Sequence, residues 1–273
     1  MVGVFDSGIG GLSVLREAQS VLPQAHFVYV ADSANAPYGE RDDAWLQARC
    51  LVIANHLRTL PADLLLMACN TATAAATPNL RSNFPAWPIV GIEPGIKPAV
   101  QKSRTKRVGV MATAGTLGSA RYSRLLAEHG QGAHVVAQPC TGLAMAIETG
   151  DESRIAELVK QHTEPLRRAE VDVVVLGCTH CAFASQWISR AMGPEVAIID
   201  TAKAVARHAA SLVKGMQREV PTPHEGATAP ELWEPHSPLP TFLTTGQPQA
   251  LERFANRWLG WTIKAQSLPT GPG

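Results

Sequence analysis

The segment Asp63-Leu-Leu-Leu-Met-Ala-Cys-Asn-Thr71 decides how the chain folds. An aliphatic run leads into a cysteine, and small polar residues follow at once. A short run that is apolar at every position is typical of a strand covered by helices on both faces of a parallel sheet. A similar segment, Asp172-Val-Val-Val-Leu-Gly-Cys-Thr-His180, lies in the second half of the chain. The sequence therefore predicts two equivalent strands, each with a cysteine at its carboxyl end.

Aliphatic runs and helical stretches alternate through most of the chain. We expect strands at Val2–Phe5, Phe27–Val30, Asp63–Met67, Pro88–Ile92, Arg107–Met111, Ala133–Ala137, Val171–Leu176 and Val196–Ile199. We expect helices at Leu12–Val21, Asp42–Leu60, Ser119–His129, Asp151–Ala169, Ala202–Met216 and Gln249–Leu259. This alternation predicts an α/β fold with parallel sheets and right-handed crossovers, and it places function at the carboxyl ends of the strands.

A second internal similarity supports a duplicated design. Val2-Gly-Val-Phe-Asp-Ser-Gly-Ile-Gly-Gly11 resembles Val108-Gly-Val-Met-Ala-Thr-Ala-Gly-Thr-Leu-Gly118. Recurring strands and glycines make any α/β protein look self-similar, but the paired cysteine segments favour a true repeat. We therefore expect two pseudo-symmetric α/β lobes, each a mostly parallel sheet flanked by helices. The first lobe is predicted to hold residues 1–97 and 208–273, including a C-terminal helix, and the second to hold residues 98–207.

Composition argues against several classes of protein. The 273 residues include 24 basic and 23 acidic side chains, so charge gives no reason to expect nucleic acid or an anionic membrane as partner. No apolar run approaches the ~20 residues that span a bilayer, and no signal-peptide pattern is present. We therefore expect a cytoplasmic protein. The Pro-rich segment 221–240 is expected to form a linker or surface loop.

The five cysteines are an odd number, which favours free thiols over a disulfide framework. Cys69 is placed at a turn from strand to helix, where the positive end of the helix dipole is expected to lower the pKa of its thiol. Asn70 and Thr71 add short polar groups beside it. The alternative interpretation is a buried, inert cysteine followed by an ordinary helix cap.

Cys178 has two neighbours that could share its chemistry. His180 can act as its proton partner, and Cys181 completes a Cys-x-x-Cys motif. That motif could be a redox pair or half of a zinc site. A structural zinc site needs four ligands, and we find no second Cys/His pair, so no metal is expected. Two cysteine turns in matching halves favour acid/base catalysis.

The glycine-rich turn Asp6-Ser-Gly-Ile-Gly-Gly11 follows the first strand and opens a helix. Its amides are predicted to hold a carboxylate, with Asp6 exposed at the end of the strand. The alternative is that Asp6 caps the helix and the glycines make a tight turn. The pattern is not G-x-G-x-x-G and has no Walker lysine, which argues against a nucleotide phosphate site.

These motifs resemble those of the glutamate racemases over nearly the whole chain. The matching segments, in order, are Phe5-Asp-Ser-Gly-Ile-Gly-Gly-Leu-Ser13, Pro37-Tyr-Gly39, Ala68-Cys-Asn-Thr-Ala72, Gly91-Ile-Glu-Pro94, Gly177-Cys-Thr-His180, Ile199-Asp200 and Thr244-Thr-Gly246. The resemblance implies racemisation of L-glutamate to D-glutamate for peptidoglycan synthesis, with no cofactor. It also implies an active site in the cleft between the lobes, and a homodimer as the assembly to test for.

The resemblance further implies roles for individual residues. Cys69 and Cys178 would carry the protons, assisted by Asp6 and His180. The substrate would be held by Asp6, Ser7, Pro37, Tyr38, Gly39, Asn70, Thr71, Thr113, Thr116, Glu148, Thr179 and His180.

The second half departs from the family pattern. Cys181-Ala-Phe replaces the usual Tyr-Pro-Leu, and Gln138-Pro-Cys-Thr-Gly-Leu-Ala replaces the usual Cys-Pro segment. Alternatives therefore stay open at this point: a racemase of aspartate or another small acidic amino acid, a Cys-x-x-Cys thiol redox protein, and a carboxylate-binding module without catalysis.

Overall fold

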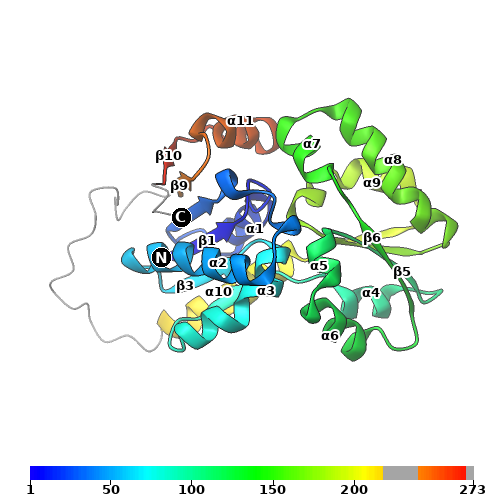
Figure 1. Ribbon diagram of the computed structural model, residues 1–273, viewed down its shortest axis with the longest axis horizontal. Helices are drawn as coiled ribbons and strands as arrows, with labels where there is room; N and C mark the ends of the chain where they lie inside the picture. Colours follow the sequence, from blue (N-terminus) through cyan, green and yellow to red (C-terminus); the bar gives the residue numbers. More distant parts are fainter. Residues whose placement is uncertain (218–238, 269–273) are drawn as a thin grey trace.

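The computed structural model describes residues 1–217 and 239–268, in which the strands form two parallel sheets (Figure 1). The first sheet has the order β10-β9-β2-β1-β3-β4 and the second has the order β6-β5-β7-β8. The first comprises β1 (Val2–Asp6), β2 (Phe27–Ala31), β3 (Leu64–Met67), β4 (Ile89–Gly91), β9 (Thr241–Thr244) and β10 (Ala265–Ser267). The second comprises β5 (Arg107–Ala112), β6 (His134–Pro139), β7 (Val173–Gly177) and β8 (Ala197–Ile199).

The two sheets share one internal order. The run β2-β1-β3-β4 of the first sheet corresponds strand for strand to β6-β5-β7-β8 of the second. In this correspondence β3 matches β7, the strands that lead to Cys69 and Cys178. The predicted α/β fold of two similar lobes is therefore confirmed. All eight predicted strands form, with ends shifted by at most a few residues.

Helices cover the sheets, and short 3₁₀ turns follow β2 and β7. The α-helices are α1 (Leu12–Val21), α2 (Asp43–Thr59), α3 (Asn70–Asn83), α4 (Ile96–Lys102), α5 (Ala114–Gly118), α6 (Ala120–His129), α7 (Leu143–Thr149), α8 (Glu152–Arg168), α9 (Ser185–Met192), α10 (Ala202–Gln217) and α11 (Pro248–Leu259). The 3₁₀ turns are η1 (Ser33–Asn35), η2 (Tyr38–Glu40) and η3 (Thr179–Ala182). No helix within residues 1–217 and 239–268 is long and apolar enough to cross a membrane.

The apolar strands are explained by burial on both faces. In β3, Leu64 and Leu66 face the core that includes α1 and α10, whereas Leu65 and Met67 face the core that includes α2 and α3. Successive side chains on a strand point to opposite faces, so a strand between two helical layers is apolar at every position. The same alternation along β7 divides its valines between two cores.

Two features differ from expectation. β9 and β10 extend the first sheet beyond β2, and neither is among the predicted strands. α10 is one continuous helix, so the predicted boundary between residues 207 and 208 falls inside it, and the domain limits stay a prediction. Residues 221–238 of the predicted Pro-rich linker lie outside the described residues.

The C-terminal helix α11 joins the lobes. It lies between β9 and β10 of the first sheet in the chain, and in Figure 1 its end lies beside α7. The indole of Trp258 donates to the carbonyl of Ile147 in α7 at 3.2 Å. Phe254 packs edge-on against Phe183, which follows η3, with ring centroids 5.0 Å apart. The helix therefore packs against the second lobe next to the segment that carries Cys178.

We predict that Phe254→Ala lowers the free energy of unfolding by about 3–5 kcal/mol, because it removes a large buried aromatic side chain. Phe254 is 2 % exposed and contacts both Phe183 and Trp258. The neighbouring exposed Arg253 provides the control, and Arg253→Ala should change stability by less than about 0.5 kcal/mol. Guanidinium unfolding of the two variants measures the difference, and equal stabilities would contradict the packing role of Phe254.

Candidate active site

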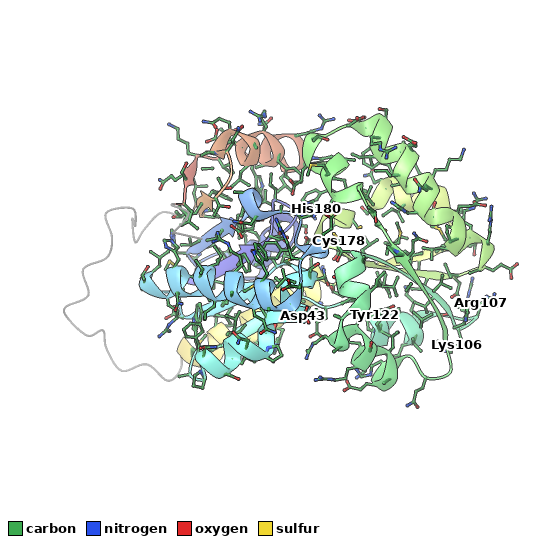
Figure 2. All side chains as sticks on the ribbon, in the orientation of Figure 1. Asp43, Lys106, Arg107, Tyr122, Cys178 and His180 are labelled. Atoms are coloured by element: carbon green, nitrogen blue, oxygen red, sulfur yellow. The ribbon has the colours of Figure 1, made fainter. Side chains whose placement is uncertain are left out.

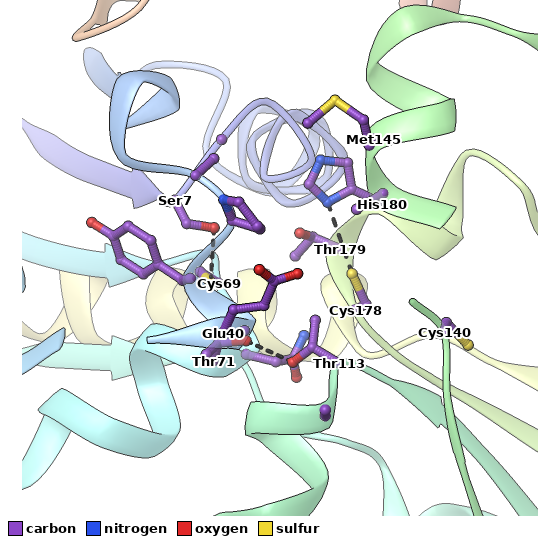
Figure 3. Close-up of a pocket in the computed structure, with 18 of the residues that line it drawn as sticks. Ser7, Glu40, Cys69, Thr71, Thr113, Cys140, Met145, Cys178, Thr179 and His180 are labelled. Carbon is purple, nitrogen blue, oxygen red and sulfur yellow. Dashed lines mark hydrogen bonds between the residues drawn. The ribbon is translucent and has the colours of Figure 1, made fainter. Parts of the chain in front are cut away.

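One cavity of about 250 Å³ lies where the carboxyl ends of strands from both sheets meet. Ser7 and Cys69 enter its wall from the ends of β1 and β3, and Thr113 and Cys178 enter from the ends of β5 and β7. Figure 3 shows these side chains around a common space. The two cysteines therefore reach one cavity from corresponding strands of different lobes.

The direction of the strands in the second sheet explains why the site forms here. Figure 2 places Cys178 and His180 at the junction of the lobes, whereas Lys106 and Arg107 lie at the outer edge of the molecule. Arg107 begins β5, so the amino ends of the strands point away from the cavity. This is the edge that open parallel sheets use for ligands.

Most of the predicted site residues line the cavity: Ser7, Pro37, Tyr38, Gly39, Cys69, Asn70, Thr71, Thr113, Glu148, Cys178, Thr179 and His180. Asp6 and Thr116 are buried and are not among its lining residues. The expectation that Asp6 is exposed is wrong, because its side chain is 0 % exposed. Thr116 meets the wall through its hydroxyl, which lies 3.0 Å from that of Thr113 and 3.2 Å from that of Thr71.

Cys69 precedes α3 and has a hydroxyl partner. Its Sγ lies 3.3 Å from Oγ of Ser7 and accepts from the backbone N–H of Ala72 at 3.4 Å. Burial and the charge of Asp6 raise the pKa of the thiol to about 12. The expected lowering of the thiol pKa by the helix is therefore wrong. The hydrogen bonds at the start of α3 do favour the thiolate, but desolvation outweighs them.

Cys178 has an imidazole partner instead. Its Sγ lies 3.8 Å from Nδ1 of His180, and Nε2 of His180 lies 2.8 Å from Oε1 of Glu148. A hydrogen bond with Cys181 and burial raise the pKa of Cys178, although His180 opposes them. Burial alone would lower the pKa of His180, but its contacts with Cys178 and Glu148 raise it well above its usual value. Contact with Cys178 and Glu148 thus favours the charged imidazole of His180, and that charge in turn favours the Cys178 thiolate.

Comparisons with known proteins agree on one family. The Asp/Glu/Hydantoin racemase family model matches residues 12–209. A glutamate racemase of Pseudomonas syringae pv. tomato is 47% identical over 208 residues, covering 76% of each chain. One of Pseudomonas paraeruginosa is 40% identical over 255 residues, covering 93% of this chain and 91% of that one.

The chain belongs to the glutamate racemase family.

Solved structures of racemases share the architecture. A glutamate racemase isoform from Bacillus anthracis superposes with a TM-score of 0.83 at 29% identity, covering 99% of this chain and 97% of that one. The Escherichia coli glutamate racemase, in complex with L-glutamate and the activator UDP-MurNAc-Ala, gives 0.82 at 27% identity, covering 97% and 96%. An aspartate racemase from Picrophilus torridus, at 16% identity and a TM-score of 0.56, shares the fold alone.

The glycine-rich motif has a specific purpose in this racemase. A Cβ on Gly8 would lie 2.6 Å from Oε1 of Glu148, and a Cβ on Gly10 would lie 2.5 Å from Nδ1 of His180. The turn amides do hold carboxylates, but those of the protein itself. Gly8 donates to Asp6 at 2.6 Å, and Ile9 donates to Glu148 at 3.2 Å. Asp6 does not cap α1, since Gly11 occupies that position without a side-chain cap.

Sequence reasoning missed the residues that hold the loop carrying Tyr38. Asp32, which is 0 % exposed, accepts from the Tyr38 hydroxyl at 2.6 Å and takes two hydrogen bonds from Arg49, each of 2.7 Å. An acid directly after the apolar strand β2 is the signal that could have revealed it. Glu40, Cys140 and Met145 also line the cavity and are absent from the predicted set. Within the described part of the chain, no group of three or more His, Cys, Asp or Glu side chains could hold a metal.

Asp6 makes hydrogen bonds in both lobes, and burial disfavours its charged form. Its Oδ2 accepts from the hydroxyl of Thr179 at 3.1 Å. Burial raises the pKa of Asp6 from 3.8 to about 6, against the favourable charge of His180. Because the folded state holds this proton more tightly than the unfolded chain, folding loses stability as the pH rises through this interval.

We predict that Asp6→Asn stabilises the fold at pH 8 by about 3 kcal/mol and has little effect near pH ~3, where both states largely hold the proton. Asn can keep both hydrogen bonds, accepting from Gly8 and donating to Thr179. Asp151 is the control, because hydrogen bonds from Ser153 and Arg154 lower the pKa of this exposed carboxyl. Asp151→Asn should give no stabilisation at pH 8. Chemical unfolding at both pH values tests this, and an Asp6→Asn variant less stable than wild type at pH 8 would contradict it.

Proposed function

We propose that this protein interconverts L- and D-glutamate, with Cys69 and Cys178 as opposed acid and base. The observation that carries the proposal is the position of the two thiols. They line one cavity from corresponding strand ends of different lobes. Racemisation removes the α-proton from one face of the carbon and returns a proton to the other. Two acid/base groups on opposite walls achieve this without turning the substrate.

Glutamate is the substrate that the relatives support. The proteins of Pseudomonas syringae and Pseudomonas paraeruginosa bear the name glutamate racemase, and the Escherichia coli structure holds L-glutamate. Aspartate, a redox function and simple carboxylate binding are less well supported by these relatives. A cytoplasmic location, a homodimer, and supply of D-glutamate for peptidoglycan belong to the proposal as well.

One thiol must lose its proton before it can accept the α-proton of the substrate. Both thiols have raised pKa values, to which burial contributes in each case. A bound amino acid brings a positively charged ammonium group next to them, and this charge favours a thiolate, more strongly where water is excluded. His180 and Glu148 stabilise charge on the Cys178 side, and Ser7 stabilises it on the Cys69 side. When catalysis reverses, the two thiols exchange roles.

The developing carbanion needs directed dipoles, and the cavity supplies hydroxyl and amide groups. The hydroxyls of Thr71, Thr113 and Thr116 lie within 3.2 Å of one another, and two of these threonines line the wall. The buried Asn70 amide has no hydrogen-bond partner among the described residues, which leaves it available to a substrate carboxylate. Such preorganised donors stabilise charge as it develops and need no reorganisation.

The remaining binding roles follow from position. Tyr38 and Gly39 line the cavity, and the hydroxyl of Tyr38 is held by a hydrogen bond to Asp32. Thr179, which follows Cys178 in the chain, also lines the cavity. We assign these residues, with Ser7, Pro37 and Glu148, to substrate binding. Asp6 and Thr116 are assigned to positioning, because both lie behind the wall.

Circular dichroism of purified protein with L-glutamate tests the function. Without added cofactor, the signal should decay to zero, because racemisation ends at equal amounts of the mirror images. L-Aspartate under the same conditions should decay at least ~10-fold more slowly, since a site shaped for one acid discriminates by contacts its shorter analogue cannot make. A stable L-glutamate signal would reject the function, and faster decay of L-aspartate would reject the substrate.

The two-cysteine mechanism is tested separately. Cys69→Ala and Cys178→Ala should each lower turnover at least ~100-fold, as expected when an acid/base group is removed. Cys50→Ala is the matched control, because Cys50 is buried in α2 and does not line the cavity. It should retain turnover within a few-fold. Full activity of either active-site variant in both directions would rule out the mechanism.

A further inference from the structure

Three thiols lie together on the second-lobe side of the site. The thiols of Cys178 and Cys140 both influence the pKa of Cys181. Cys140 and Cys178 line the cavity, whereas Cys181 is 1 % exposed and lies beneath it. The proposed racemisation uses Cys178 alone. Cys140 and Cys181 lie in the two segments of the second half that depart from the family pattern.

The geometry of the Cys178–Cys181 pair suits a disulfide bond. The backbone N–H of Cys181 donates to the carbonyl of Cys178 at 3.0 Å, closing a turn over four residues. The first and last Cα atoms of such a turn lie less than about 7 Å apart, which overlaps the ~4.4–6.8 Å span of disulfides. The turn therefore holds the two residues at a separation compatible with a disulfide.

The Cys69 side has no equivalent. The hydrogen-bond partners of its sulfur are Ser7 and the backbone of Ala72, and neither is a thiol. An oxidised Cys69 would therefore have no adjacent sulfur to resolve it. The capacity for reversible oxidation belongs to one wall of the cavity only.

We infer that Cys178 and Cys181 form a peroxide-responsive modification site, in which oxidation closes a disulfide and stops turnover reversibly. The Cys178 thiolate attacks one oxygen of hydrogen peroxide and breaks the O–O bond. The products are a sulfenic acid on Cys178 and hydroxide, which takes up the proton the thiol released. The Cys181 sulfur then attacks the sulfenic sulfur, its proton passes to the departing hydroxyl, and a second water leaves. Two thiols are oxidised and one peroxide is reduced to two waters.

The position of each group explains why the reaction takes this course. Hydrogen peroxide is small enough for the cavity, which reaches Cys178 but not Cys181. The protonated His180, 3.8 Å from Cys178, stabilises the attacking thiolate. Cys181, held beneath, is the resolving thiol, and a thiol-based reductant restores both residues. The loss of turnover rests on the proposed role of Cys178, whereas the disulfide itself does not.

Peptide mapping of the full-length protein after treatment with equimolar hydrogen peroxide tests the modification directly. Wild type should yield a peptide that contains an internal Cys178–Cys181 disulfide and has lost the mass of two hydrogen atoms. This readout is independent of racemase activity. If the disulfide forms in a protein that never racemises glutamate, only the proposed function fails. A map showing Cys178 bonded to Cys140, or no bond at all, would overturn the inference.

The rate of glutamate racemisation after peroxide treatment tests the effect of the disulfide on catalysis. Wild type should lose at least ~10-fold in rate, as expected when an acid/base group is blocked, and should regain it with dithiothreitol. Saturating glutamate during treatment should slow the loss. In Cys181→Ala treated with a several-fold excess of peroxide, the loss should persist after dithiothreitol, because a second peroxide oxidises the unresolved sulfenic acid to the sulfinic acid and is itself reduced to water.

Cys140→Ala is the matched control, since it removes the other thiol neighbour of Cys181 and should recover as wild type does. Recovery in Cys181→Ala, or its loss in Cys140→Ala alone, would refute the assignment. If Cys181→Ala does not fold, the wild-type peptide map decides.

Discussion

The contact between Glu148 and the turn after β1 is the constraint on which the site depends. Glu148 comes from the second lobe, yet its carboxylate accepts from Ile9 of the first lobe at 3.2 Å and pairs with His180 at 2.8 Å. Glycine at positions 8 and 10 leaves the room that a side chain would fill. The proton partner of one thiol is thus positioned by the lobe that carries the other, so cavity and lobe interface form together.

This arrangement concentrates ionisable groups where water is scarce. Asp6 and His180 are buried and Glu148 is mostly covered, and the charge of His180 favours both carboxylates, whereas Glu148 opposes the charge on Asp6. A buried charge that loses its partner is strongly destabilising, whereas a neutral isostere can be neutral or stabilising. The site therefore carries a stability cost that a protein selected for folding alone would not retain. The apolar cores around β3 and β7, buried on both faces, offset it.

Much of this could be predicted from the sequence, and the failures have physical causes. The strands around Cys69 and Cys178 were predictable because burial on both faces leaves an unmistakable apolar run. β10 was not, since three residues of mixed polarity at a sheet edge carry no periodic signal. The raised thiol pKa values were missed because the helix terminus is visible in the sequence, whereas desolvation depends on residues brought together from both lobes. Asp32 was overlooked for the same reason, as its partner Arg49 lies on the next helix.

The duplication of the fold does not extend to the proton relays. Cys69 has a hydroxyl and a buried carboxylate behind it, whereas Cys178 has an imidazole and a mostly covered carboxylate. Two different relays are compatible with racemisation, because the free enantiomers have equal energy whatever the enzyme does. Unequal thiols change only how the bound forms are distributed and which step is slower in each direction. The imidazole and the neighbouring thiol on the second-lobe side are therefore compatible with the same overall equilibrium.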